Sequence, residues 1–166
     1  PPPRRHTLFP YTTLFRSGDA GWLVMQHARL YARDEGFDIR FEAIVARVLA
    51  EFIETRDPSC ERAFIAHRGD ERLGSIFCSR HDAETARLRM FLVLPEARGC
   101  GLGRRLLSEC MGFARDTGFR RMMLHTHKSH AAACALYEKV GWRCTRSFPV
   151  ENFGQQLVEM RWQVDL

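Results

Sequence analysis

The sequence lacks the patterns that mark several classes of protein. No two of its six cysteines have only two residues between them, so the sequence has no CxxC pair of the kind used by zinc ribbons and thioredoxin-like redox sites. No apolar run approaches the roughly 18 residues that a membrane-spanning helix needs. Lysine is almost absent, with only Lys128 and Lys139, and the other basic residues are arginines. We therefore expect a protein outside the membrane, without a metal, whose free thiols lie in a reducing, cytoplasmic compartment.

The net positive charge from residue 18 onward is also smaller than that of the whole chain. The net charge is +5, but Arg4, Arg5 and Arg16 precede residue 18, and setting them aside leaves +2. The acidic residues of the remaining chain are interspersed with the basic ones, so no basic stripe is visible. Direct contact with nucleic acid is therefore not expected.

The 166 residues suit one domain, which we place at residues 18–166. Hydrophobic spacing predicts a strand at Gly21–Met25 that runs into a helix ending near Glu35, and a second helix at Ile39–Glu54. Further elements are predicted downstream: strands at 61–68, 71–80, 86–93, 120–126, 142–150 and 155–164, and helices at 104–118 and 130–140, the latter capped by Ser129. The sum is an α/β (α+β) fold with a mixed, mostly antiparallel central sheet flanked by helices.

A glycine-rich turn, Arg98-Gly-Cys-Gly-Leu-Gly103, joins a predicted strand to a predicted helix. Its glycines let the backbone approach a ligand closely, and the helix start presents free N–H groups to an anion. Arg98 and Arg104 add forked donors for phosphate oxygens. A P-loop would need Lys-Ser or Lys-Thr, and a dinucleotide-binding turn would need GxGxxG, and neither pattern is present. The turn therefore indicates a phosphate-bearing ligand of another kind.

Two motifs resemble those of the GNAT superfamily of N-acetyltransferases. The first, Arg/Gln-x-x-Gly-x-Gly/Ala after a strand, is matched by the turn that begins at Arg98. The second, Ala-x-x-x-Tyr-Glu-Lys-x-Gly-Phe on a helix, is matched by residues 133–141, with Trp142 in place of phenylalanine. The resemblance covers about residues 18–166. Several stretches are also similar to the C-terminal half of bacterial fusion proteins that join a MarR-type DNA-binding domain to a GNAT domain.

The resemblance implies a GNAT fold in which acetyl-CoA lies in a cleft between two splayed strands. The strand before the glycine turn would offer main-chain groups to the pantetheine arm and splay from the strand at 121–126. The turn would hold the pyrophosphate through its backbone N–H groups. The cofactor-binding residues expected on this basis are Leu92, Val93, Leu94, Arg98, Gly99, Cys100, Gly101, Leu102, Gly103, Arg104, His130 and Tyr137.

The resemblance also implies catalytic roles. Tyr137 stands where relatives carry the tyrosine that protonates the leaving thiolate, and the backbone N–H of Val93 would stabilise the oxyanion. The position at which some relatives carry a catalytic glutamate is Arg87 here, and an arginine cannot accept a proton at neutral pH. The general base therefore stays open between a relay of bulk water, Glu84 and a nearby histidine.

Arg87, Arg89 and Phe91 alternate along one predicted strand, so we expect them to share one face of it. Arginines on that face suit an anionic acceptor, although solvation of both side chains is the simpler expectation.

Three histidines cluster in sequence after the next strand begins. His125 and His127 alternate on the strand and His130 follows three residues later, which resembles a metal-ligand pattern, but no carboxylate accompanies them. No metal is expected. His125 or His127 could serve as the base or contact the substrate, and both could equally be ordinary side chains at the edge of the cleft. His130 stands where many relatives have an asparagine near the pantetheine.

These observations favour an acetyl-CoA-dependent N-acetyltransferase that moves the acetyl group to a primary amine of a small molecule or protein by direct attack in a ternary complex. The alternative is a non-catalytic acyl-CoA-sensing module of a transcriptional regulator. The expected partners are acetyl-CoA and an amine acceptor, and a homodimer is compatible with the sequence.

Residues 1–17 stand apart from the rest. TLFPYTTLFRS, residues 7–17, coincides with one reading frame of a common sequencing-library adapter, so we interpret it as non-native sequence that replaced the natural upstream segment. Residues 1–17 are therefore expected to form a non-native or disordered tail. If the tail is physically present, two placements stay open: it could lie on a surface or pair with a neighbour, because apolar residues seek cover.

Overall fold

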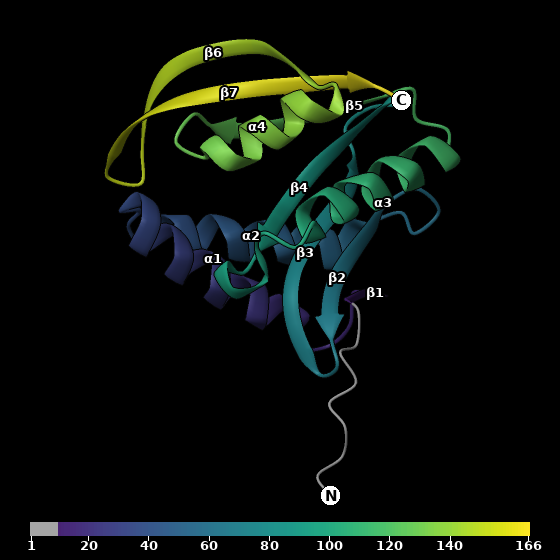
Figure 1. Cartoon of the computed structure of the whole chain (residues 1–166), viewed down its shortest axis with the longest axis horizontal. Coiled ribbons are helices and arrows are strands. Elements are labelled where there is room, and N and C mark those ends of the chain that lie inside the picture. Colours follow the sequence, from purple (N-terminus) through teal and green to yellow (C-terminus); the bar gives the residue numbers. More distant parts are fainter. Residues whose placement is uncertain (1–9) are drawn as a thin grey trace, which may run out of the picture.

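A computed structural model describes residues 10–166 of the chain (Figure 1). Its helices are α1 (Asp19–Glu35), α2 (Ile39–Thr55), α3 (Leu102–Asp116) and α4 (Ala131–Val140), with a short 3-10 helix η1 (Pro95–Ala97). Its strands are β1 (Tyr11–Leu14), β2 (Arg62–Arg68), β3 (Glu71–Arg80), β4 (Thr85–Val93), β5 (Arg121–His127), β6 (Arg143–Asn152) and β7 (Gln155–Asp165).

The seven strands form one sheet in the order β1-β2-β3-β4-β5-β7-β6. Only β4 and β5 run parallel, and every other neighbouring pair is antiparallel. The predicted α/β fold with a mixed, mostly antiparallel sheet is confirmed. The parallel pair lies in the middle of the sheet, and the two strands separate toward one end.

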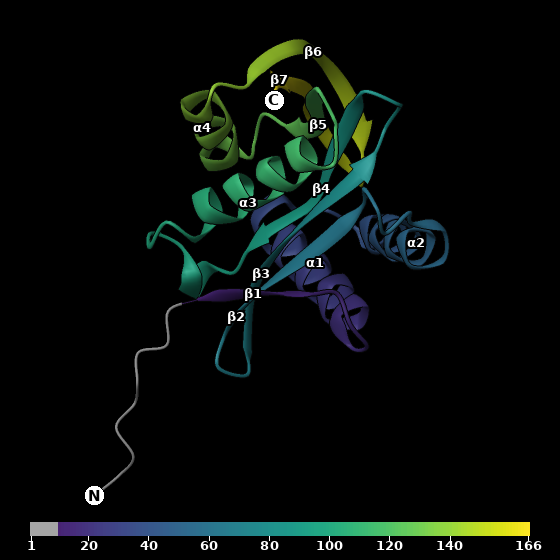
Figure 2. The same ribbon diagram turned by 90° about the vertical axis from the view of Figure 1, so that its right-hand side faces the viewer.

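Helices cover both faces of the sheet (Figure 2). Helices α3 and α4 pack on one face, where the largest apolar cluster includes Leu106, Leu107 and Met122, all fully buried. Helices α1 and α2 cover the other face, where Leu23 and Leu49 pack against the sheet. Each face thus has its own core, and the sheet between them is held rigidly from both sides.

The start of the domain differs from its prediction. Residues 21–25 were expected to be a strand, but they belong to α1, which begins at Asp19. The apolar run Trp22–Val24 fits either a short buried strand or one turn of a helix, so its composition does not decide between them. The helix follows because Leu23, His27 and Leu30 recur at helical spacing and are all buried against the sheet.

The starts of the two later helices also shift. Helix α3 begins at Leu102, two residues before the predicted start, because Gly101 takes the left-handed conformation of its N-cap (φ 81°). Helix α4 is preceded by His130 as N-cap, and no side chain caps it, so the predicted cap by Ser129 is wrong.

Part of the expected tail belongs to the sheet. Strand β1 pairs with β2 from Tyr11 to Leu14, and the ring of Phe15 lies edge-on to that of Phe77 at 5.4 Å between centroids. A disordered tail therefore does not describe residues 11–15: Phe15 is packed against the sheet, whereas the side chains of Tyr11 and Leu14 are exposed. Residues 1–9 of the tail lie outside the described residues, and the non-native origin of the segment stays a prediction.

No helix within residues 10–166 combines the length and the apolar character that crossing a membrane requires.

Candidate active site

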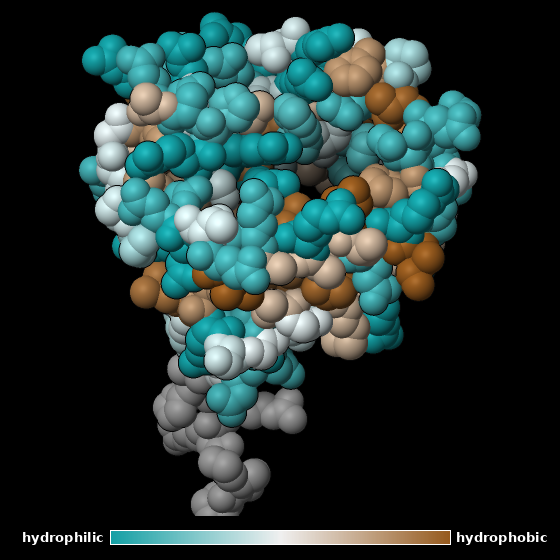
Figure 3. All heavy atoms as spheres, turned by 180° about the vertical axis from the view of Figure 1, so that it is seen from behind, coloured by the Kyte–Doolittle hydropathy of each residue, from teal (hydrophilic) through white to brown (hydrophobic). Residues whose placement is uncertain are grey.

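A cleft opens in the sheet where β4 and β5 separate. The two strands pair only over Thr85–Arg87 and Arg121–Met123, whereas β5 goes on pairing with β7 as far as His127. Beyond Arg87 the edge of β4 that faces β5 is therefore free of strand pairing. The resulting cleft has a volume of about 740 Å³, and it is visible as a hollow on the face shown in Figure 3. The splayed strand pair expected from the sequence is present.

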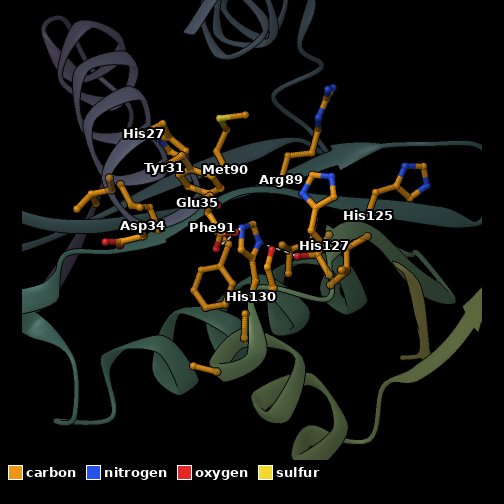
Figure 4. A pocket seen from close by; sticks show the side chains of 18 of the residues that line it. His27, Tyr31, Asp34, Glu35, Arg89, Met90, Phe91, His125, His127 and His130 are labelled. Atoms are coloured by element: carbon orange, nitrogen blue, oxygen red, sulfur yellow. Dashed lines mark hydrogen bonds and ion pairs between the residues drawn. The ribbon is translucent and has the colours of Figure 1, made fainter. Parts of the chain in front are cut away.

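A bulge in β4 turns its side chains over partway along the strand. Met90 has a φ of 50°, and the pairing with β3 shifts register opposite it. Arg89 and Met90 consequently lie on the α1/α2 side of the sheet, whereas Phe91 packs into the core under α3 and α4 (Figure 4). The prediction that Phe91 shares a face with Arg87 and Arg89 is therefore wrong, because strict alternation fails at a bulge.

The glycine turn leads from the end of β4 into α3. Gly99 and Gly101 both adopt positive φ angles, of 79° and 81°, which let the chain turn into the helix. The first hydrogen bond of the helix runs from Arg105 N–H to the Gly101 carbonyl, and no side chain caps the preceding N–H groups. The N-terminus of α3 thus keeps free donors and a positive dipole end for an anion.

The last residues of β4 carry backbone groups toward the cleft. Leu94 N–H donates to the Leu73 carbonyl on β3. Because successive N–H groups along a strand point to opposite sides, the N–H of Val93 points away from β3 and toward the gap. The Nε of Arg98 donates to the Val93 carbonyl at 3.1 Å, which holds the guanidinium at the cleft mouth; among residues 10–166 its two terminal nitrogens have no hydrogen-bond partner.

Tyr137 projects from α4 into the base of the cleft. Its side chain is 3% exposed, and its ring packs beside Phe91, Trp142 and Trp162 with centroids 5.7–6.2 Å apart. Burial raises the pKa of its hydroxyl well above the usual range of tyrosine. The phenol therefore keeps its proton at neutral pH.

The histidines of β5 line the opposite side of the cleft. His127 is the last residue of β5, and its ring lies 5.7 Å from that of Phe37 and 5.7 Å from that of His130 between centroids. Burial lowers the pKa of His127 below its ordinary value. Burial and then the charges of Arg87 and Arg161 lower the pKa of His125 as well. Both imidazoles are thus largely neutral at pH 7 and able to accept a proton.

His130 lies between α1 and α4 in a contact that the sequence did not reveal. Its Nε2 lies 3.4 Å from a carboxylate oxygen of Glu35, and its Nδ1 lies 3.1 Å from the Thr126 hydroxyl (Figure 4). Burial lowers the pKa of His130, and the charge of Glu35 opposes that shift. The imidazole is therefore held in place at the point where α1, β5 and α4 meet.

Aromatic side chains from α1, α2 and the β6–β7 turn form one wall of the cleft. Tyr31 stacks on Phe41 at 4.6 Å, and Phe153 lies 5.0 Å from Phe37 and 5.2 Å from Phe41 between ring centroids. Asp38 N–H donates to the Phe153 carbonyl at 3.0 Å, so the α1–α2 connection and the β6–β7 turn are joined. Burial raises the pKa of Tyr31 to about 12.

The structure brings together most of the residues that the sequence singled out. The predicted residues that line the cleft are Leu92, Val93, Arg98, Gly103, His125, His127, His130 and Tyr137. Gly99, Cys100, Gly101 and Arg104 lie in or beside the turn at its mouth. The side chains of Leu94 and Leu102 are buried, so only their backbone groups are available to a ligand. Glu84 lies at the opposite end of β4, beside Arg120 and Arg121, and does not line the cleft.

Sequence reasoning missed the wall that α1 and α2 contribute. The additional lining residues from these helices are His27, Leu30, Tyr31, Asp34, Glu35, Phe41 and Ile44. They carry no motif, and helical periodicity alone marks them as a buried face. Within the described part of the chain, no group of three or more His, Cys, Asp or Glu side chains is arranged to hold a metal ion.

A sheet opened between two parallel strands, with a glycine turn and an uncapped helix at its mouth, defines the class of acyltransferase domains. The particular family follows from the sequence match: residues 22–142 match the Acetyltransferase (GNAT) family, and the chain belongs to that family.

Individual relatives agree with this assignment. The chain is 34% identical over 85 residues to a mycothiol acetyltransferase of Geodermatophilus obscurus, a match that covers 48% of this chain and 28% of the relative. The matches span 16–57% of the length of the curated relatives.

Solved structures share the GNAT fold. A ribosomal-protein-alanine N-acetyltransferase from Brucella melitensis superposes with a TM-score of 0.75 at 18% identity, over 94% of this chain and 99% of that one. A spermidine N-acetyltransferase from Vibrio cholerae, in complex with CoA and spermine, gives a TM-score of 0.71 at 15% identity, over 94% and 95% of the two chains.

Proposed function

We propose that this chain is an acetyl-CoA-dependent N-acetyltransferase that moves an acetyl group to a primary amine by direct attack in a ternary complex. The single observation that carries the proposal is the opening between β4 and β5, with an uncapped helix N-terminus at one end and neutral proton-transfer groups on both sides. A thioester and an amine that entered from opposite faces would meet there.

The residues at the cleft mouth suit coenzyme A. The free N–H groups at the start of α3 would bind the pyrophosphate, and the unused nitrogens of Arg98 would add charge-assisted hydrogen bonds. The exposed edge of β4 at Leu92–Val93 would accept the pantetheine arm as a strand-like neighbour. When bound, acetyl-CoA supplies the activated acetyl group.

Two groups on the α4 side would act on the thioester. The Val93 N–H would donate a hydrogen bond to the carbonyl oxygen as negative charge develops on it. Tyr137 would protonate the sulfur of coenzyme A as its bond to the acetyl carbon breaks, and solvent would return that proton to the phenolate. Burial keeps Tyr137 protonated until this step.

His127 is the best-placed base among the alternatives left open by the sequence. It lies on the α1/α2 side of β5, where its ring is 5.7 Å from that of Phe37 and where an incoming amine would lie, and burial keeps the ring largely neutral at pH 7. It would take a proton from the ammonium group, directly or through a water, so that the amine attacks in its neutral form. Glu84 is too far along β4 to do this.

Isothermal titration calorimetry with acetyl-CoA tests the first half of the proposal, and release of the free thiol of coenzyme A over a broad panel of primary amines tests the second. We expect binding in the micromolar range and turnover with at least one class of amine. Absence of binding at high micromolar acetyl-CoA would contradict the proposal. Binding without turnover across the panel would favour the sensing alternative, which the relatives, named as acetyltransferases, do not support.

A further inference from the structure

The acceptor half of the cleft carries two arginines, Arg87 and Arg89, on the same face of β4. We propose that they bind a carboxylate on the acceptor, so that the substrate class is an amine that also bears a carboxylate, such as an amino acid or the acidic end of a short peptide. This inference rests on the proposed function, because it names the acceptor for the same cleft.

The other half-buried arginines of the sheet each have a carboxylate or an aromatic ring as partner. Within residues 10–166, Arg72, Arg121 and Arg161 each have a carboxylate oxygen within 4.0 Å. Arg62 places its guanidinium 4.2 Å from the ring centroid of Phe113.

Arg87 and Arg89 have neither kind of partner among the described residues, although both are half-buried and burial lowers the pKa of each. A guanidinium removed from water without a counter-charge is unfavourable unless a ligand supplies that charge. Of the two guanidiniums, only that of Arg87 has a nitrogen, Nε, that is fully buried without a partner among the described residues, whereas the nitrogens of Arg89 remain accessible to water and to a ligand.

A further observation is the position of unused donors. The Nε of Arg87 is buried without a hydrogen-bond partner, and one terminal nitrogen lies 3.5 Å from Nδ1 of His125. Figure 4 shows Arg89 projecting from β4 to the side opposite Phe91, into the acceptor half. A planar carboxylate fits the fork of a guanidinium in a bidentate manner.

The nearby acidic side chains do not neutralise this pair. Glu159, which also lines the cleft, lies 3.5 Å from Arg161 and 3.8 Å from His125. Glu51 shares a smaller hollow with Arg89 on the side of α2, but their charged atoms are more than 4.0 Å apart. The two acidic groups reduce the local positive potential without occupying either guanidinium.

The distance along β4 sets the size of the acceptor. At about 3.3 Å per residue, the backbone of Arg89 lies roughly 10–13 Å before that of Val93, where the acetyl carbonyl would be bound. The arginine side chains extend over part of this distance. An amine and a carboxylate separated by a few bonds can therefore engage His127 and the arginines together, while Phe41, Ile44 and Met90 contact the apolar part of the molecule.

The test compares matched pairs of amines: α- and ω-amino carboxylates, each with its carboxamide and its phosphonate counterpart. We expect kcat/KM for the carboxylates to exceed that for the carboxamides at least tenfold. The double variant Arg87→Gln/Arg89→Gln should remove this preference, with little change in the rate for the carboxamides or in the Kd for acetyl-CoA. Arg87→Lys/Arg89→Lys keeps the charge and should retain part of the preference.

Arg120→Gln, which removes one positive charge from an exposed position outside the cleft, is the matched control and should leave the preference intact. Equal rates for carboxylates and carboxamides in the unaltered protein would overturn the proposal, and so would a double variant that slows both amines equally. A clear preference for the phosphonates would overturn the carboxylate assignment.

Calorimetric titration of the same pairs into the protein, with and without coenzyme A, keeps the two proposals separate. If acetyl-CoA does not bind but the carboxylates bind more tightly than the carboxamides through the arginines, the proposed function fails and the anion site stands. If acetyl-CoA binds and neither amine of any pair does, the anion site fails alone.

Discussion

The two halves of the cleft are built by different means. The half under α3 and α4 presents mainly backbone: the free edge of β4, the glycine turn and the first N–H groups of α3. The half under α1 and α2 presents side chains, including two arginines, two strand histidines and an aromatic cluster. Backbone recognition suits a ligand that never changes, and side-chain recognition suits an acceptor that differs among relatives.

The two halves of the cleft therefore differ in which substitutions they can accept. Backbone groups require particular φ angles at a few positions, so the glycines of the turn are fixed by conformation. Side chains on the other half can be exchanged without moving the backbone, since each stands on a helix or strand packed against the sheet. Variants in the half under α3 and α4 should therefore change acetyl-CoA binding or the chemical step, whereas variants in the half under α1 and α2 should change the choice of acceptor.

Tyr137→Phe should produce the largest effect. Loss of the phenolic proton should lower kcat about 10²–10³-fold, because general acid catalysis contributes this much. The ring stays packed against Phe91 and Trp142, so the Kd for acetyl-CoA should be unchanged. Steady-state release of coenzyme A and calorimetry measure the two quantities. Tyr11→Phe, which removes a phenol outside the cleft, is the control, and a kcat for Tyr137→Phe equal to that of the control would refute the acid role.

Low pH should lower the free energy of unfolding through His27, a buried histidine on the acceptor side of the cleft. His27 is buried on α1, its Nδ1–H donates to the Leu23 carbonyl at 2.8 Å, and burial lowers its pKa from 6.5 to about 4. Because the unfolded chain binds this proton more readily, stability is full above pH 6.5 and is lost as pH falls toward 4. The loss amounts to about 3 kcal/mol in the free energy of unfolding.

Urea unfolding at pH 7.5 and pH 4.5 measures this loss, and His27→Gln should lose less stability over the same range. His81→Gln, at an exposed turn, should behave like the unaltered chain. An NMR titration of the unaltered protein decides the matter even if the His27 variant does not fold. A His27 pKa near 6.5 would contradict the buried neutral imidazole.

Gly101→Ala should weaken acetyl-CoA binding about five- to thirtyfold. The φ of 81° at Gly101 costs an L-residue about 1–2 kcal/mol, and relief of that strain would rotate the N–H groups at the start of α3. Calorimetry measures the change in Kd. Gly112→Ala is the matched control, since Gly112 lies in the middle of α3, where an added Cβ would meet nothing within 4 Å. An unchanged Kd for Gly101→Ala would show that the turn does not hold the ligand.

The same division decides how much could be predicted from the sequence. The positions of the glycine turn and Tyr137 at the cleft could be predicted because each belongs to a motif whose residues are close together in the chain. The fold could be predicted because the alternation of strands and helices is local as well. The bulge at Met90 could not, because no glycine or proline marks it and it arises from the fit of β4 against β3.

The contact between Glu35 and His130 joins residues 95 positions apart, and only packing of α1 against the sheet creates it. The start of α1 carries consecutive apolar residues, which fit a short strand as well as a helix. The lining residues that α1 and α2 contribute are thus brought to the cleft only by tertiary packing, whereas Arg87, Arg89 and His127 could be picked out from alternation along their strands.

His127→Gln should have the smallest effect on turnover and the most informative pH dependence. Solvent can also take the proton of an ammonium group, so we expect a decrease in kcat/KM of about fivefold at pH 7. Because burial lowers the pKa of His127 below 6.5, the unaltered enzyme should gain activity from this group as pH rises through that lower value and level off above it.

In the variant that low-pH limb should disappear, and the remaining rise should follow the pKa of the free amine. The difference between the two proteins should therefore shrink above pH 9, where the amine loses its proton unaided. His125→Gln provides the comparison, because His125 lies two residues before His127 on β5 and its side chain points to the same face of the sheet. If His125→Gln removes the low-pH limb and His127→Gln keeps it, the base lies beside Arg87, and the reacting amine sits closer to the arginines than a base at His127 would place it.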